Sequence, residues 1–188
     1  VSVVRVPDKP SLEGAREKIR TIAAAVGRVQ RGEELIRAME RGLLALRSKL
    51  AQQRSKLKGL FLYLRGPQAT FVCGEGSNPV GMMALAGISN AARGIKDCTQ
   101  MTAEAVVAAQ PDLIVVFTKG LASIGGVEGL RKLPGVAQTP AGQAGRVVAI
   151  DDLYLGAFGP RTGRAALDLF IGAYEQSGLY VAEPKEDR

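Results

Sequence analysis

The hydrophobic pattern divides the chain near residue 59. Before it, apolar residues recur every three or four positions between residues 36 and 50, the spacing of one narrow apolar face on a helix. After it, short continuous apolar runs alternate with helix-like segments. That alternation is typical of a parallel sheet covered by helices on both faces. We therefore predict a long helix followed by an α/β layered domain over residues 59–178.

Local signals place elements in the first part. Residues 1–6 are β-branched and predict a strand, yet no other early segment supplies a strand to pair with it. The start is therefore expected to be a boundary within a longer chain. Ser11 is a good N-cap for a helix that ends at Gly27. Basic residues on the long helix alternate with glutamates, which indicates a solvated face.

Buried strands and covering helices account for the second part. Strands are predicted at residues 60–64, 70–73, 113–117 and 146–150, and helices at 79–86, 102–109 and 161–174. Residues 120–133 are rich in glycine and predict short helical pieces.

Composition narrows the possible functions. The net charge is +7, which favours an acidic partner, although a basic surface with no partner explains it equally well. Aromatic residues make up 5% with no Trp, which argues against a stacking platform for single-stranded nucleic acid. The absence of histidine excludes a histidine general base, a histidine-containing triad and imidazole metal ligands.

Export and redox state are less constrained. No apolar run of about 18 residues is present, and no signal peptide is recognisable in the sequence. Cys73 and Cys98 can form one disulfide or remain two buried thiols, and their number alone favours thiols.

In an open parallel sheet, ligands bind beyond the carboxyl ends of the strands. The first such end carries Tyr63 and Arg65, which share a face because alternate residues of a strand point the same way. A guanidinium and a ferric ion both favour the phenolate form of a tyrosine, so the pair suits iron ligation through oxygen. The alternative is a core tyrosine beside an exposed arginine.

Residues 74–78 follow a strand and precede a helix, so they could cradle a phosphate on backbone N–H groups. They lack the third glycine of a dinucleotide fingerprint and the Lys-Ser/Thr of a P-loop. Glu75 would also repel a phosphate. A turn followed by a helix cap is the favoured interpretation.

The loop after the last buried strand offers a second group of candidates. Tyr154 and Phe158 could present flat apolar surface to a planar ligand. Arg161 opens a helix, where its charge opposes the helix dipole, so it needs an anionic partner. That partner is either a ligand carboxylate or one of Asp151 and Asp152.

These segments together resemble haem-transporter substrate-binding proteins of the class III periplasmic-binding-protein family. The resemblance covers about residues 1–178 and rests on segments 117–121, 123–127, 133–142, 151–155 and 158–162. It implies two α/β lobes joined by one long helix, with haem held between the lobes. The fold expected is a Rossmann-like parallel sheet lobe with helices on both faces, preceded by the inter-lobe helix.

The resemblance also implies a domain organisation. Residues 1–29 would be the remnant of an N-terminal lobe, 30–56 the inter-lobe helix, 57–178 the C-terminal ligand-binding lobe and 179–188 a tail. In Gram-positive members, a Tyr-x-Arg lies on the first strand of this lobe. Carried over, it makes Tyr63 the axial iron ligand and Arg65 its support.

Further site residues follow from the same comparison. Arg161 would face a haem propionate and Tyr154 would line the cleft, with additional cleft candidates Phe158, Lys119 and Ser77. The two cysteines depart from the family pattern. An exported location makes a Cys73–Cys98 disulfide plausible, and a Cα separation above about 7 Å would exclude it.

The predicted function is capture of haem, as transported ligand, and delivery to the permease of an ABC importer. The protein would be exported, in the periplasm or lipid-anchored at the outer face of the membrane, and not an enzyme. A corrinoid or a ferric siderophore is an alternative cargo. A nucleotide-binding α/β enzyme domain is the alternative from another class. Nucleic acid is not an expected partner, whereas self-association of the 188-residue chain is.

Overall fold

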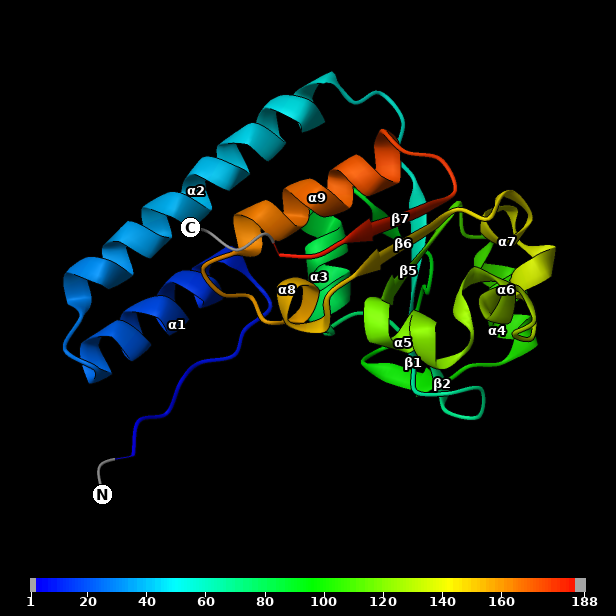
Figure 1. Cartoon of the computed structure of the whole chain (residues 1–188), viewed down its shortest axis with the longest axis horizontal. Coiled ribbons are helices and arrows are strands. Elements are labelled where there is room, and N and C mark those ends of the chain that lie inside the picture. Colours follow the sequence, from blue (N-terminus) through cyan, green and yellow to red (C-terminus); the bar gives the residue numbers. More distant parts are fainter. Residues whose placement is uncertain (1–2, 185–188) are drawn as a thin grey trace.

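The computed structural model describes residues 3–184 and begins with a helical hairpin (Figure 1). Helix α1 (Leu12–Ala25) starts at Ser11, whose side chain accepts a hydrogen bond from the Gly14 N–H at 3.0 Å. Gly27, with φ of 65°, turns the chain into α2 (Val29–Gln52). The apolar face of α2 packs on α1 and α9 through four buried residues: Ile36, Met39, Leu43 and Leu46.

Within residues 3–184, the second part is a seven-stranded sheet with the order β4-β2-β1-β5-β6-β7, and β3 pairs with the first residues of β1. The strands are β1 (Lys58–Leu64), β2 (Thr70–Cys73), β3 (Ser89–Asn90), β4 (Cys98–Gln100), β5 (Leu113–Phe117), β6 (Val147–Ile150) and β7 (Leu179–Ala182). Strands β1, β5, β6 and β7 are parallel, whereas β2 runs antiparallel to both β1 and β4.

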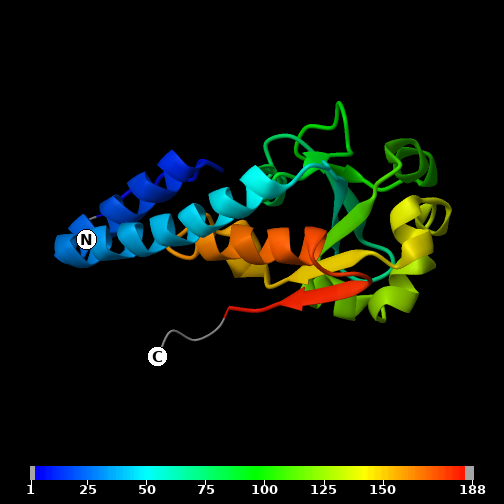
Figure 2. The same cartoon turned by 90° about the horizontal axis from the view of Figure 1, so that it is seen from above.

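Helices cover both faces of the sheet, as Figures 1 and 2 show. One core lies between the sheet and α2, α3, α8 and α9, and the other lies under α4 to α7. The remaining helices are α3 (Asn78–Leu85), α4 (Ala103–Ala109), α5 (Thr118–Ser123), α6 (Gly126–Arg131), the 3₁₀ helix η1 (Val136–Gln138), α7 (Pro140–Ala144), α8 (Asp152–Gly156) and α9 (Thr162–Tyr174).

The α/β layered fold predicted from the sequence is confirmed, with three differences in detail. The sheet is mixed because residues 65–69 form a tight connection that turns β2 back along β1. Residues 3–6 form no strand, since nothing in the described chain pairs with them. Residues 179–182, expected in a tail, form edge strand β7, which buries only Ala182 and exposes Leu179 and Val181. These four residues are an apolar run, but a run this short does not distinguish a strand from other structure by its pattern alone.

None of the helices within residues 3–184 combines the length and the apolar character needed to cross a bilayer.

Candidate functional site

The carboxyl ends of β1, β5 and β6 meet at one edge of the sheet, because these strands are adjacent and parallel. The connection after β1 lies against α5, the helix after β5. The Gly66 N–H donates to the Ser123 hydroxyl at 2.9 Å, and Gly120 lies so close to Leu64 that a Cβ there would be 3.0 Å from the Leu64 carbonyl oxygen. The segments that follow two neighbouring strands therefore form one continuous surface.

Tyr63 lies at the centre of this edge in a cluster of three aromatic rings. Its ring centroid is 6.1 Å from that of Phe117 on β5, perpendicular to it, and 6.2 Å from that of Phe71 on β2. The side chain is partly exposed. Within the described chain the Tyr63 hydroxyl has no hydrogen-bond partner, whereas the hydroxyls of Tyr154 and Tyr174 donate to Asp168 and to the Gly87 carbonyl. The phenol oxygen of Tyr63 is thus available to a ligand.

Two cations lie at the same edge of the sheet as this phenol. The Arg65 guanidinium lies 5.4 Å from the centroid of the Tyr63 ring, and the side chain is otherwise exposed. Lys119 is exposed in the first turn of α5, directly after β5. The structure therefore brings Tyr63, Arg65 and Lys119 to one edge, as expected for a surface that receives an anionic or metal-bearing ligand.

The second predicted group, Tyr154 and Phe158, does not offer open surface. Tyr154 is 3% exposed, and its hydroxyl donates to the Asp168 carboxylate at 2.7 Å. Burial, and then this carboxylate, raise the pKa of the Tyr154 phenol far above its ordinary value. Phe158 is 1% exposed, and a Cβ built on Gly81 of α3 would be only 3.3 Å from its ring. Both rings face inward because α8 and the turn after it pack down onto α3 and α9.

Arg161 stands apart from the Tyr63 cluster. Its guanidinium lies 5.6 Å from the Tyr154 ring centroid and borders a cleft of about 580 Å³ between α2 and α9. Asp151, one of the partners considered from sequence, instead caps α8 by accepting a hydrogen bond from the Tyr154 N–H at 2.9 Å. Arg161 therefore has a cation–π contact within the described chain and faces solvent for the rest.

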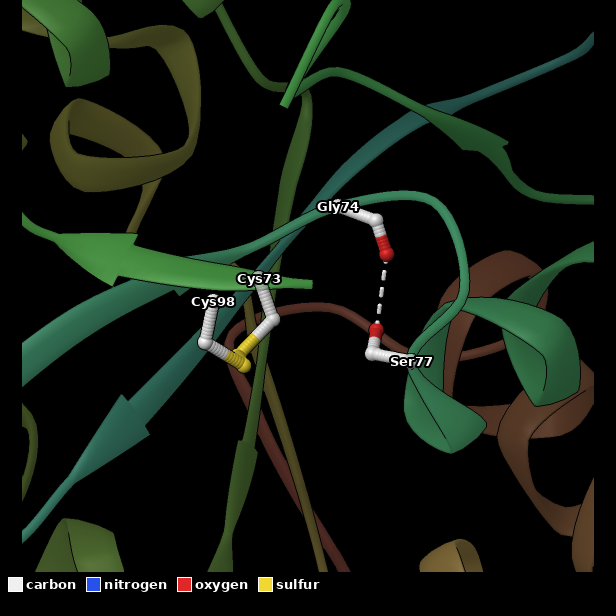
Figure 3. Close-up of a disulfide and its surroundings, with 4 residues drawn as sticks. All are labelled: Cys73, Gly74, Ser77 and Cys98. Carbon is white, nitrogen blue, oxygen red and sulfur yellow. Dashed lines mark hydrogen bonds between the residues drawn. A yellow bond between two sulfur atoms is a disulfide. The ribbon is translucent and has the colours of Figure 1, made fainter. Parts of the chain in front are cut away.

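The loop after β2 is closed on itself and on a neighbouring segment. The N–H groups of Gly74 and Glu75 donate to the carbonyls of Asp97 and Ile95, at 2.7 and 2.8 Å. The Ser77 hydroxyl donates to the Gly74 carbonyl at 2.8 Å (Figure 3). Three backbone N–H groups of this loop, those of Gly74, Glu75 and Ser77, are paired with backbone carbonyls, which leaves fewer free donors for a phosphate and argues against a nucleotide site here.

Ser77 nevertheless stands close to the edge that carries Tyr63. The next residue, Asn78, donates from its side chain to the Gly156 carbonyl at the end of α8, at 2.7 Å. A Cβ on Gly156 would in turn lie 3.7 Å from the Phe117 ring. The loop thus reaches the aromatic cluster indirectly, although β2 itself runs away from that edge.

Cys73 and Cys98 are joined by a disulfide, with an S–S distance of 2.00 Å and a Cα separation of 4.0 Å. They stand directly opposite each other on β2 and β4 (Figure 3). The alternative of two buried thiols is not what the structure contains.

Sequence reasoning missed Phe71 and Phe117 as members of the site. Phe71 faces Tyr63 because the β1–β2 register pairs these two residues, and Phe117 ends the strand on the other side. The apolar runs predict the strands. They do not predict that β1 pairs with both β2 and β5, because this pairing depends on the tertiary fold.

A mostly parallel sheet with an accessible aromatic and cationic edge is the architecture of a ligand-binding lobe. A family model described as periplasmic binding protein matches residues 1–154, and the chain belongs to this family. The family is one of binding proteins rather than enzymes, as predicted, and it implies a periplasmic location. Comparison with curated protein sequences found no match.

Solved structures of haem-binding proteins are similar to the chain. The periplasmic haem-binding protein RhuT from Roseiflexus sp. RS-1, in apo form, is 46% identical with a TM-score of 0.85, over 89% of this chain and 65% of RhuT. The periplasmic haem-binding protein BhuT, in complex with two haems, is 31% identical with a TM-score of 0.87, over 93% and 67%. The haem-binding protein HmuT is 33% identical with a TM-score of 0.82, over 89% and 56%. The chain thus spans between 56% and 67% of the length of these proteins.

Proposed function

We propose that the chain forms the haem-binding lobe of the substrate-binding component of an ABC importer, with Tyr63 as the iron ligand and Arg65 as its support. The observation that carries the proposal is an accessible phenol that has no hydrogen-bond partner among residues 3–184 and lies beside a guanidinium at the ligand edge of the sheet. Ferric iron favours phenolate oxygen, and the nearby cation favours the anionic form of the phenol.

The neighbouring structures support this choice of residues. Two further structures of HmuT carry alanine in place of a tyrosine and of an arginine two positions later. Tyr63 and Arg65 have the same residue types at the same spacing. Lys119, from the adjacent segment, would meet a propionate of the same haem. Haem would arrive as the transported ligand, not as a resident cofactor.

The proposed partner is the membrane permease of the importer, with the protein lipid-anchored in the periplasm or at the outer face of the membrane. In this organisation residues 57–178 act as the ligand-binding lobe and α2 connects it to the preceding part of the protein. The family match and the haem-binding neighbours support a transport role of this kind.

We also propose that the 188-residue chain associates with itself. Apolar side chains at the junction of α1 and α2 are exposed, and they border a cleft of about 270 Å³. Contiguous exposed apolar surface of this kind favours association.

The test of iron ligation is the Tyr63→Phe variant in the full-length protein. This change keeps the ring that packs on Phe71 and Phe117 but removes the oxygen, so the ferric phenolate absorption should disappear. Haem affinity should fall at least about tenfold, as expected when a metal–ligand bond is lost. Tyr180→Phe, on edge strand β7, is the matched control and should leave both properties unchanged.

Two results would contradict the proposal. Retention of the wild-type spectrum and affinity in Tyr63→Phe would refute Tyr63 as ligand. If the wild-type protein does not bind hemin but binds a corrinoid or a ferric siderophore in the same titration, haem is refuted as the cargo.

A further inference from the structure

The Cys73–Cys98 disulfide lies one row of side chains from the Tyr63 ring. Along β2, Phe71 and Cys73 point to the same face, because they are two residues apart. Phe71 pairs with Tyr63 on β1, and Cys73 pairs with Phe61. The disulfide therefore fixes β2 at Cys73. On this face Cys73 is the neighbour of Phe71, whose ring contacts Tyr63.

Without this bond, β4 would be held only weakly. It is three residues long, all three are exposed, and within the described chain it pairs with β2 alone. A strand of this length at a sheet edge makes few hydrogen bonds and opens readily. Since Cys98 stands directly opposite Cys73, the disulfide fixes both the contact and the register of this edge.

The segment before Cys98 is joined to the loop after Cys73. Besides the two bonds from Gly74 and Glu75, the Asp97 N–H donates back to the Glu75 carbonyl at 2.8 Å. The approach is close, because a Cβ on Gly74 would lie 1.9 Å from the Ile95 carbonyl oxygen. Both chains leave the disulfide side by side, so the covalent bond closes one end of this double segment.

The same loop leads to the ligand edge. It ends in the Ser77 turn, and Asn78 then binds the carbonyl at the end of α8, beside Phe117. Restraint at Cys73 is thus passed in two directions: along β2 to Phe71, and along the loop to α8. Both routes end on rings that contact Tyr63.

We propose that the Cys73–Cys98 disulfide is a positioning element for ligand binding, which keeps Phe71 and the loop of residues 74–77 preorganised around Tyr63. The proposal rests on the proposed haem function. When the bond is absent, β4 and the loop sample more conformations, and the ligand must order them on binding. If binding must order about two side chains of this region, the haem affinity falls by about tenfold.

The test compares oxidised wild-type protein with the Cys73→Ala/Cys98→Ala variant of the full-length protein. Thiol reductants are avoided because a thiolate can itself ligate haem iron. The double variant should bind hemin about tenfold more weakly and keep the ferric phenolate absorption, since Tyr63 is unaltered. Thr99→Ala, at an exposed position of β4 next to the disulfide, should bind like wild type. If the double variant does not fold, Cys98→Ala alone gives the same comparison and retains the buried Cys73 side chain.

Hydrogen exchange supplies a readout that does not depend on haem. Amides of residues 71–77 and 95–100 should exchange faster in the double variant, whereas those of β5 and β6 should keep their protection. Unchanged exchange, or faster exchange with wild-type haem affinity, would overturn the positioning role. Failure of the wild type to bind haem would instead refute the proposed function, and the exchange data would still decide whether the disulfide orders the loop.

Discussion

The tyrosines show how position in the fold, rather than residue type, decides a role. Tyr63 ends a parallel strand, so its phenol emerges at the sheet edge between Phe71 and Phe117. Tyr154 lies in α8, which packs down onto α9, so its phenol is enclosed and bonded to Asp168. A phenol that reaches solvent can meet a ligand, whereas an enclosed and bonded phenol holds two helices together.

The buried Tyr154 predicts a specific alkaline destabilisation. Burial and the hydrogen bond to Asp168 raise its pKa in the folded state, whereas the unfolded phenol titrates near its ordinary value of about 10. The unfolded state therefore loses its proton first, and the stabilisation present below pH of about 10 is lost as pH rises further. Tyr154→Phe should reduce the fall of unfolding free energy with pH by up to about 1.4 kcal/mol per pH unit.

Urea denaturation at neutral and alkaline pH measures this effect. At neutral pH the same variant should lower the free energy of unfolding by about 1 to 2 kcal/mol, because Asp168 loses a partly buried hydrogen bond. If the unfolding free energy of Tyr154→Phe and of wild type changed equally with pH, the Tyr154 phenol would have the same pKa in the folded and the unfolded state, which contradicts the prediction.

Some site residues could be found from the sequence and others could not. Tyr63 and Arg65 were identifiable because their spacing places them on one face at the end of an apolar run. Phe158 was predicted to offer surface to a ligand, but its ring is buried. It adopts a left-handed backbone conformation, with φ of 44°, that turns its ring inward against α3. A conformation rarely adopted by phenylalanine leaves no signal in a hydrophobicity pattern.

At the scale of elements, α2 and α9 approach each other through glycines. A Cβ on Gly163 would be 2.1 Å from the Met39 carbonyl oxygen, and one on Gly42 would be 2.8 Å from the Gly163 carbonyl carbon. The backbones of the long helix and of the last helix are therefore in direct contact. This contact fixes the helical hairpin onto the sheet domain, and side chains at those positions would separate the helices.

Gly163→Ala is therefore expected to destabilise the protein by about 1 to 3 kcal/mol, because a backbone atom rather than a flexible side chain occupies the space that Cβ needs. Chemical denaturation measures the change. Gly159→Ala is the control, since a Cβ there meets nothing within 4 Å. Equal stability of the two variants would mean that the helices separate at little cost.

Element length explains which elements were predicted. The long helix and the five apolar residues 113–117 carry enough repeats to be recognised. Strand β4 has three exposed residues and is held by the disulfide and by its pairing with β2. Its sequence has no apolar alternation, so only tertiary contacts define it as a strand.

At the scale of the whole molecule, some apolar surfaces are covered and others are exposed. Both faces of the sheet are covered, whereas the junction of α1 and α2 exposes 46% of Ile22, 63% of Val26 and 61% of Val29. The junction of α1 and α2 lies at the end of the hairpin away from the sheet, as Figures 1 and 2 show. Within the part of the chain that the structure describes, the far end of the helical hairpin is uncovered.

A second copy of the chain can cover this surface, which predicts concentration-dependent association of the 188-residue protein. Apolar area buried between copies contributes about 25 cal/mol per Å², so a charge placed at its centre should weaken the contact strongly. Sedimentation velocity of Val26→Lys should show monomers at concentrations where wild type associates. Leu44→Lys, at an equally exposed position on the outer face of α2, should associate like wild type. If both variants are monomeric where wild type associates, net charge rather than the hairpin surface governs association. If wild type is a monomer at every concentration, the predicted association does not occur.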